Sequence, residues 1–162
     1  KRPDRGRIKQ TPFFQRLNKG KEIIAIDFGS KRDRGQLQNS IREADIIIES
    51  SRPRAMENLG ISAEEEVDRG AIWCSITGYG RKQNPNRVGF GDDAAAAGSL
   101  LAKVNKSLWF VGDASADPLT GATAAALTHG LWFAGSSGLI DISLAATSNL
   151  HTHGIIPKGI TW

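Results

Sequence analysis

Cysteine is nearly absent from this sequence, which holds only Cys74 among its 162 residues. One thiol cannot build an intrachain disulfide framework, and this composition is typical of proteins from a reducing compartment. We therefore expect a fold held together by packing, and a cytoplasmic location. Cys74 lies in an apolar segment with no base next to it, so we interpret it as a core residue and not as a nucleophile.

Long hydrophobic runs are also missing. No stretch is long and apolar enough to span a bilayer, although 40% of the residues are hydrophobic. Residues 1–20 carry too many charges for a signal peptide. The charged fraction of 23% is ordinary for a globular protein. These features predict an ordinary globular protein and no membrane as partner.

Metal-ligating side chains are sparse. His151 and His153 are two residues apart, but no cysteine or carboxylate stands near them at a ligand-like spacing. We therefore predict no metal site. The tail 151–162 holds no other functional signal.

Positive charge is present, but it is concentrated near the start of the chain. Residues 1–36 hold eleven Lys and Arg against four Asp and Glu, whereas the net charge of the whole chain is +4. Such an arm can bind nucleic acid or a phosphorylated ligand, or it can be merely solvated. No nucleic-acid-reading motif accompanies it, and aromatic residues interleave with it only at Phe13 and Phe14. We therefore predict no nucleic-acid partner.

Short apolar runs alternate with amphipathic segments. Runs rich in β-branched residues predict strands at 21–28, 45–49, 71–77 and 139–144. Helices are predicted at 34–43, 53–59, 62–68, 92–103 and 120–133. A further short helix is predicted after the strand at 139–144, ending at about residue 150. Ser62, with Glu65 three residues later, is a candidate N-cap. Strands joined by helices through short links indicate right-handed crossovers and an α/β fold with a parallel Rossmann-like sheet flanked by helices.

The predicted domain organisation has three parts. Residues 1–20 are expected to form a basic irregular arm, and residues 21–150 a single α/β domain. Residues 151–162 are expected to form a C-terminal tail.

Several short segments follow one another in a specific order. They are Leu17–Lys21 with Ile24–Asp27, Glu43–Pro53, Cys74–Gly80, Gly89–Ala94, Asp117–Gly121 and Ile140–Leu144. In order and spacing they resemble family III CoA-transferases, the CaiB–BaiF family. The resemblance runs from about residue 11 to residue 148. It implies that the chain corresponds to the middle portion of that family's large domain, a fragment less than half of the usual length.

The resemblance assigns to Asp117 the role of the nucleophile. The family attacks an acyl-CoA thioester with an aspartate and passes through anhydride and aspartyl-CoA intermediates. Asp117 stands just before the predicted helix 120–133, whose N-terminal amides favour an anion, and Gly121 would leave room for a thioester. A plain helix N-cap or Asp-Pro turn is the alternative. Asp113 lacks the Thr-Gly that follows Asp117, and we interpret it as a turn residue.

Coenzyme A, carried as acyl-CoA, is the substrate that the resemblance implies, with a carboxylic acid as acceptor. The residues implied to line its site are Leu17, Asn18, Lys21, Ser50, Arg52 and Arg54. Lys21 would contact a phosphate; its alternative is a solvated lysine at a strand edge. Ser50, Arg54 and Asn58 stand where the family commonly has Asn, Gly and, in some members, Arg.

The expected function is therefore transfer of CoA between an acyl-CoA and a carboxylic acid. Alternatives are a noncatalytic α/β remnant and a CoA-binding or oligomerisation module. An acyl-CoA racemase is disfavoured, because Phe90 stands where the family's racemases have histidine and cannot relay a proton. The family forms dimers, so the resemblance implies a homodimer, and a sheet without the family's first strand exposes an edge that favours self-association. We also expect little or no transferase activity from the isolated chain.

Overall fold

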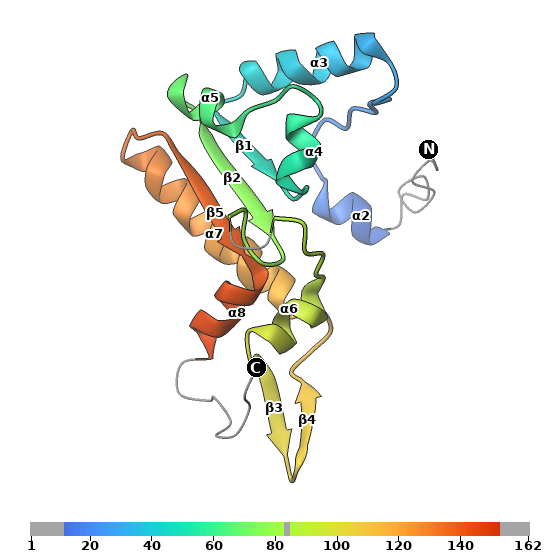
Figure 1. Ribbon diagram of the computed structural model, residues 1–162, viewed down its shortest axis with the longest axis vertical. Coiled ribbons are helices and arrows are strands. Elements are labelled where there is room, and N and C mark those ends of the chain that lie inside the picture. Colours follow the sequence, from blue (N-terminus) through green and yellow to red (C-terminus); the bar gives the residue numbers. More distant parts are fainter. Residues whose placement is uncertain (1–11, 83–84, 153–162) are drawn as a thin grey trace. The chain divides into compact units, whose positions relative to one another are not determined.

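The computed structural model describes residues 12–82 and 85–152. The chain divides into two compact units, residues 1–35 and 36–162. In the first unit, helix α2 spans Pro12–Leu17 (Figure 1), where an irregular arm was expected. Residues 1–11 lie outside the described residues.

The predicted strand at 21–28 is wrong. Residues 21–27 have irregular backbone, and Ile23 and Ile24 are 61% and 45% exposed. An apolar β-branched run favours a strand only where a partner strand completes its hydrogen bonds. The segment leads into helix α3, Lys31–Arg42, whose start is capped by Ser30: its hydroxyl accepts a hydrogen bond from the Asp33 amide at 3.3 Å.

A three-stranded parallel sheet forms the centre of the second unit. Its strands are β1 (Ile46–Glu49), β2 (Ile72–Thr77) and β5 (Gly138–Ser143), in the order β1-β2-β5 (Figure 1). In the β1–β2 register Ile48 stands opposite Cys74, and in the β2–β5 register Cys74 stands opposite Ile140. These strands lie where the sequence predicted them, and the α/β fold class is confirmed.

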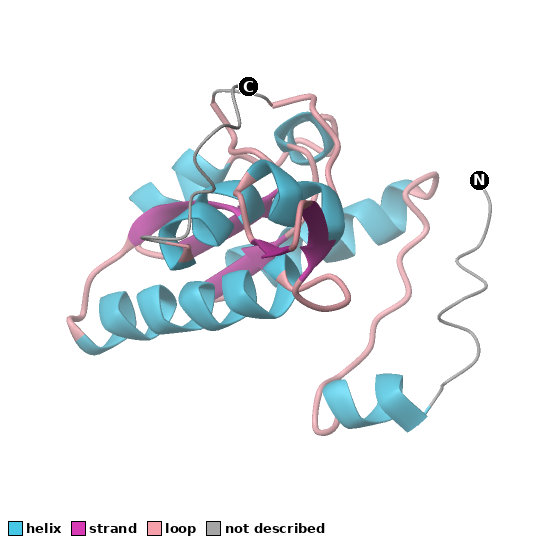
Figure 2. Ribbon diagram, turned by 90° about the horizontal axis from the view of Figure 1, so that it is seen from below, coloured by secondary structure: helices cyan, strands magenta, loops and turns pink. Residues whose placement is uncertain are grey.

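Helices cover both faces of the sheet (Figure 2). On one face, α4 (Pro53–Glu57) and α5 (Ala63–Asp68) pack with the end of α3 on Ile47 and Trp73. On the other face, α7 (Ala116–Phe133) packs on β2 and β5. Helix α5 begins as predicted, because the Ser62 hydroxyl accepts a hydrogen bond from the Glu65 amide at 3.2 Å.

Helix α6 (Gly91–Ala97) ends earlier than the predicted helix 92–103. Ser99 adopts a left-handed φ of 62°, which stops the helix. A hairpin of β3 (Leu101–Val104) and β4 (Ser107–Phe110) follows, with Asn105 at φ 57° in its turn. The alanine-rich sequence favours a helix locally. The apolar residues of the hairpin do not recur at a helical spacing, so the helix does not continue into them.

Helices α6, α7 and α8 (Leu144–His151) pack against one another beyond the sheet. Gly98 allows the contact between α6 and α8, because a Cβ there would lie 2.4 Å from the Ala145 carbonyl oxygen. This packing brings the start of α7 beside the carboxyl end of β2. Within the described parts of the chain, no helix is long and apolar enough to cross a membrane.

Candidate active site

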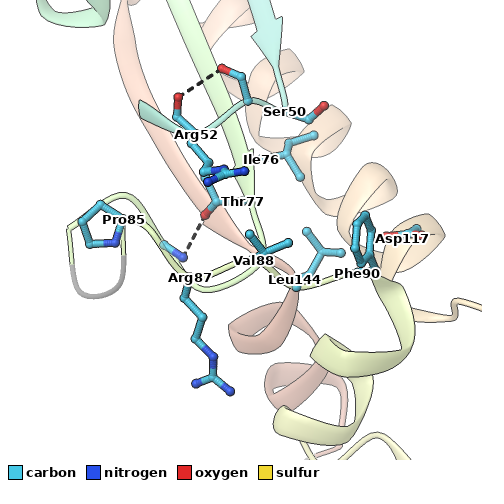
Figure 3. Close-up of a pocket in the computed structure, with 14 residues that line it drawn as sticks. Ser50, Arg52, Ile76, Thr77, Pro85, Arg87, Val88, Phe90, Asp117 and Leu144 are labelled. Atoms are coloured by element: carbon cyan, nitrogen blue, oxygen red, sulfur yellow. Dashed lines mark hydrogen bonds between the residues drawn. The ribbon is translucent and has the colours of Figure 1, made fainter. Parts of the chain in front are cut away.

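A pocket of about 440 Å³ opens at the carboxyl ends of β1 and β2. Ligands of open α/β sheets bind at this edge, because loops leaving parallel strands converge there. The pocket is lined by Ser50, Ser51, Arg52, Ile76, Thr77, Gly78, Gly80, Pro85, Arg87, Val88, Gly89, Phe90, Asp117 and Leu144. Figure 3 shows Ser50 and Arg52 on one side of it, and Asp117 and Phe90 on the other.

Asp117 supplies the one carboxylate among the described residues that line the pocket. It lies in the first turn of α7, which begins at Ala116 and not at Thr120 as predicted. The carboxylate is therefore inside the helix rather than before it. Partial burial of the carboxyl group raises the pKa of Asp117 above its usual value, and the negative charge of Asp92 adds to this shift.

The turn before α7 is built around Asp92 and Ala114. Ala114 has a left-handed φ of 50°, and its amide donates a hydrogen bond of 3.0 Å to the Asp92 carboxylate. A non-glycine residue in this region is strained by about 1 kcal/mol, and the hydrogen bond offsets part of that cost. Asp92 therefore holds the turn that places Asp117, and it also explains part of the raised pKa.

Gly91 leaves the space that Asp117 occupies. A Cβ at Gly91 would lie 2.8 Å from the Asp117 Oδ2 and 2.8 Å from the Ala114 Cα. Because one of these neighbours is backbone, the contact could not be relieved by a side-chain rotation. Gly91 at the start of α6 thus allows the Asp117 carboxylate of α7 to lie close to the α6 backbone.

The segment after β2 forms a second wall through close backbone contacts. The Thr77 hydroxyl accepts a hydrogen bond from the Gly80 amide at 2.8 Å (Figure 3). A Cβ at Gly89 would lie 2.5 Å from the Tyr79 ring, so only glycine fits there without movement. The Arg87 guanidinium carbon lies 3.8 Å from the centre of the same ring, in a cation–π contact.

Sequence reasoning missed Thr77, Arg87 and Gly89 as pocket residues. No helix, strand or site residue was predicted between residues 81 and 88. The pairs of glycines at 78 and 80 and at 89 and 91 were the available signal, because glycine permits close backbone approach. Arg87 carried no such signal; its place follows from its contact with Tyr79.

The residues predicted to bind CoA lie in different parts of the chain. Ser50 and Arg52 line the same pocket as Asp117. Arg54 is exposed on α4 and is not among the lining residues. Leu17, Asn18 and Lys21 belong to the first unit, where the Asn18 side-chain amide donates to the Phe14 carbonyl at 3.0 Å. The binding roles of all six residues stay predictions.

The pocket is lined by the carboxylate residue Asp117 and by Arg52. Arg87 also lines it, but its guanidinium group lies over the Tyr79 ring and points away from the other lining residues (Figure 3). A carboxylate can act as a nucleophile toward an activated acyl group, and guanidinium groups bind phosphate or carboxylate. Among the described residues, no group of three or more His, Cys, Asp or Glu is placed to hold a metal ion. His153, one of the two histidines considered above, lies outside the described residues.

Comparison with known proteins gives a consistent family. A sequence profile described as CoA-transferase family III matches residues 2–149. The chain is 32% identical over 93 residues to an acyl-CoA transferase of Fusarium pseudograminearum, which covers 55% of this chain and 20% of that protein. It is 32% identical over 74 residues to the acetyl-CoA:oxalate CoA-transferase of Acetobacter aceti, covering 44% of this chain and 19% of that protein.

Solved structures share the fold. A CaiB/BaiF family protein from Brucella suis superposes with a TM-score of 0.74 at 23% identity, over 83% of this chain and 38% of that one. Rv3272 from Mycobacterium tuberculosis gives a TM-score of 0.73 at 18% identity, over 84% of this chain and 41% of that one. The chain thus spans well under half the length of the relatives it matches. Because the family profile matches nearly the whole chain, the chain belongs to CoA-transferase family III.

Proposed function

We propose that this chain carries the nucleophile and part of the CoA pocket of a family III CoA-transferase. The observation that carries the proposal is the position of Asp117: its carboxylate lines a pocket at the carboxyl ends of the strands together with Arg52. In the proposed reaction, Asp117 attacks the thioester carbonyl of an acyl-CoA and expels the CoA thiolate. The products of this step are a mixed anhydride and free CoA thiolate.

The remaining steps conserve the energy of the thioester. The CoA thiolate attacks the Asp117 carbonyl of the anhydride, which releases the donor acid and forms an aspartyl-CoA thioester. The acceptor carboxylate attacks that thioester, and the expelled CoA thiolate then attacks the acceptor acyl carbonyl of the second anhydride. The acceptor leaves as its CoA thioester, and the Asp117 carboxylate is regenerated.

The surroundings of Asp117 support this role. A raised pKa makes a carboxylate more basic, and a more basic carboxylate is the better nucleophile when ionised. The first-turn position of Asp117 lies at the positive end of the α7 dipole, which favours the negative charge that develops in the reaction.

The CoA site is proposed to include Ser50 and Arg52 at the pocket, with Arg54 on the neighbouring helix. Arg52 would pair with a phosphate or carboxylate of the substrate. Leu17, Asn18 and Lys21 of the first unit are proposed to contact the nucleotide end of CoA. No metal is part of the proposed reaction, since each step is an exchange between acyl groups.

A second candidate function is a CoA-binding or oligomerisation module without turnover. Among the described residues, β1 pairs only with β2, and its side chains Ile46 and Ile48 are 37% and 61% exposed. An open strand edge with apolar side chains favours pairing with another chain. We propose that the chain forms a homodimer and that alone it has little or no transferase activity.

The test combines binding with a search for a covalent adduct. The chain is titrated with CoA by calorimetry, and it is incubated with an acyl-CoA and a carboxylate acceptor before intact-mass spectrometry. The variants are Asp117→Ala and, as a control, Asp113→Ala, an exposed aspartate that does not line the pocket.

The proposal predicts CoA binding by both variants. Any covalent adduct should disappear in Asp117→Ala and remain in Asp113→Ala. An adduct that persists in Asp117→Ala would remove Asp117 as the nucleophile. Absence of CoA binding in the unmodified chain would leave the noncatalytic remnant as the remaining function. Measurable turnover by the unmodified chain would contradict the predicted inactivity.

A further inference from the structure

A buried carboxylate outside the proposed reaction directly precedes the pocket residues Ser50 and Ser51 in the chain. Glu49 is the last residue of β1, and its side chain is on the buried side of the strand with 7% of the residue exposed. A charge that is removed from water is costly unless polar partners surround it. The partners of Glu49 therefore indicate why a carboxylate stands at this position.

The Glu49 carboxylate is bound by the segment that follows β1 and by strand β2. Its Oε2 accepts hydrogen bonds from the amide and the hydroxyl of Ser51, each at 2.7 Å. Its Oε1 accepts a hydrogen bond from the hydroxyl of Ser75, the residue opposite it in β2. Hydrogen bonds to a charged acceptor are stronger than those between neutral groups. The carboxylate thus fixes the chain as it leaves β1.

Arg81 joins the same group from the segment that leaves β2. Its Nη1 lies 3.7 Å from the Glu49 Oε1, and its Nη2 lies 3.4 Å from the Glu64 Oε1. The backbone amide of Arg81 donates to the Asp141 carboxylate of β5 at 3.1 Å. The side chain of Arg81 is only 12% exposed. Contacts to β1, α5 and β5 therefore hold this residue in one place.

Glu49 and Arg81 are each next in sequence to a residue that lines the pocket. Ser51, bound by Glu49, lines one wall together with Arg52. Gly80, which precedes Arg81, lines the other wall. We propose that Glu49 and Arg81 act as positioning residues: their ion pair sets the spacing between the two walls of the pocket and so orients Arg52 toward the substrate.

The proposal rests on the proposed function only where it concerns CoA. Neither Glu49 nor Arg81 lines the pocket, so neither is a catalytic residue. A purely structural role would stabilise the whole sheet, whereas a positioning role acts at the two walls. The two roles predict different patterns of amide exchange.

The experiment compares Glu49→Gln with Glu57→Gln, the same change at an exposed position on α4. Glutamine keeps the size of the side chain, but it has one acceptor oxygen and no charge. Hydrogen exchange is measured by NMR at the amides of Ser51 and Arg81 and at those of β5. Thermal unfolding and CoA titration are measured on the same samples.

We expect exchange at Ser51 and Arg81 to become about tenfold faster in Glu49→Gln, because the Ser51 amide loses its charged acceptor and the Arg81 side chain loses the ion pair that holds its segment. Exchange in β5 should stay within about twofold of the unmodified chain. The CoA dissociation constant should rise about tenfold in Glu49→Gln and stay unchanged in Glu57→Gln. A second variant, Arg81→Met, should reproduce the loosening at Ser51, and the double variant should add little to either change.

Several outcomes would overturn the proposal. Unchanged exchange at Ser51 and Arg81 would show that the ion pair sets no spacing, and a uniform increase that includes β5 would show a structural role alone. Local loosening with an unchanged CoA dissociation constant would remove the role in substrate orientation. If the unmodified chain does not bind CoA, the proposed function fails, while amide exchange still decides whether Glu49 holds the two walls.

Discussion

The two faces of the sheet in the second unit differ in how completely they are covered. On the face packed by α3, α4 and α5, Ile47 and Trp73 are 8% and 0% exposed. On the opposite face, α7 buries Cys74 of β2 completely, but Ile48 of β1 remains 61% exposed. Ile48 and Cys74 stand opposite each other in the register. The second face is therefore closed over β2 and open over β1.

Because the two faces differ in coverage, we expect one to contribute mainly to the stability of the fold and the other to association between chains. A residue on the closed face contributes through burial, which is lost when its side chain is removed. A residue over the open part gains burial only when another surface covers it. Substitutions on the two faces should consequently affect different measurements.

The largest effect is expected at the closed face. Trp73→Ala removes a side chain that is 0% exposed in the cluster between β2 and α5, and it should lower the free energy of unfolding by about 3–5 kcal/mol. Chemical denaturation followed by circular dichroism measures this change. Trp73→Phe is the control; it keeps most of the apolar volume, and it removes an indole N–H that has no hydrogen-bond partner among the described residues. A loss in Trp73→Phe as large as in Trp73→Ala would contradict packing as the cause.

A smaller effect on stability, but a clear effect on association, is expected at the open part of the other face. Ile48→Lys places a charge on an exposed position of β1 and should change the free energy of unfolding by less than about 0.5 kcal/mol. If chains pair along β1, the same charge should shift the chain from dimer to monomer in sedimentation velocity.

The matched control for Ile48→Lys is Leu150→Lys, the same kind of change at a 54% exposed position of α8. Its sedimentation should equal that of the unmodified chain. A dimer that survives Ile48→Lys but not Leu150→Lys would move the interface from the β1 edge to α8.

The smallest effect is expected at the pocket beside α7, and it depends on pH. The pKa of Asp117 is raised above its model-peptide value of 3.8, so the ionised carboxylate is less stable in the folded chain than in the unfolded chain. Asp117→Asn removes that penalty and should raise the melting temperature slightly at neutral pH. The gain should shrink as the pH falls through the raised pKa and vanish below 3.8.

Thermal unfolding at several pH values checks this prediction. Asp113→Asn, at an exposed position before α7, serves as the control for removing a carboxylate from the same turn. A gain in Asp117→Asn that grows toward low pH would have the wrong sign and would contradict the raised pKa.

Local sequence signals predicted the elements whose patterns are complete within a few residues. The apolar runs of β1, β2 and β5 were recognised because strands buried in a parallel sheet are almost continuously apolar. The Ser62 cap of α5 was recognised because both capping groups lie within one turn. The run at 21–28 has the same local signal as these strands, yet it is not a strand, since pairing depends on residues elsewhere in the chain.

The sequence predicted some of the residues at the site and missed others. Asp117 was identified from the segment Asp117–Gly121, and Ser50 and Arg52 lie at the same pocket. Arg87 and the supporting Asp92 were missed as contributors, because their roles arise from contacts with Tyr79 and Ala114 and not from any motif.

The amino-acid sequence by itself determined the α/β class, the three paired strands and the family, because periodicity and ordered motifs are properties of the chain alone. Only the tertiary structure decided which carboxylates meet the pocket. Asp117 reaches it because α7 begins at Ala116 and Gly91 leaves space beside it, whereas Glu49 is buried and bound by Ser51, Ser75 and Arg81. Contacts between segments distant in sequence depend on packing, and no local pattern records them.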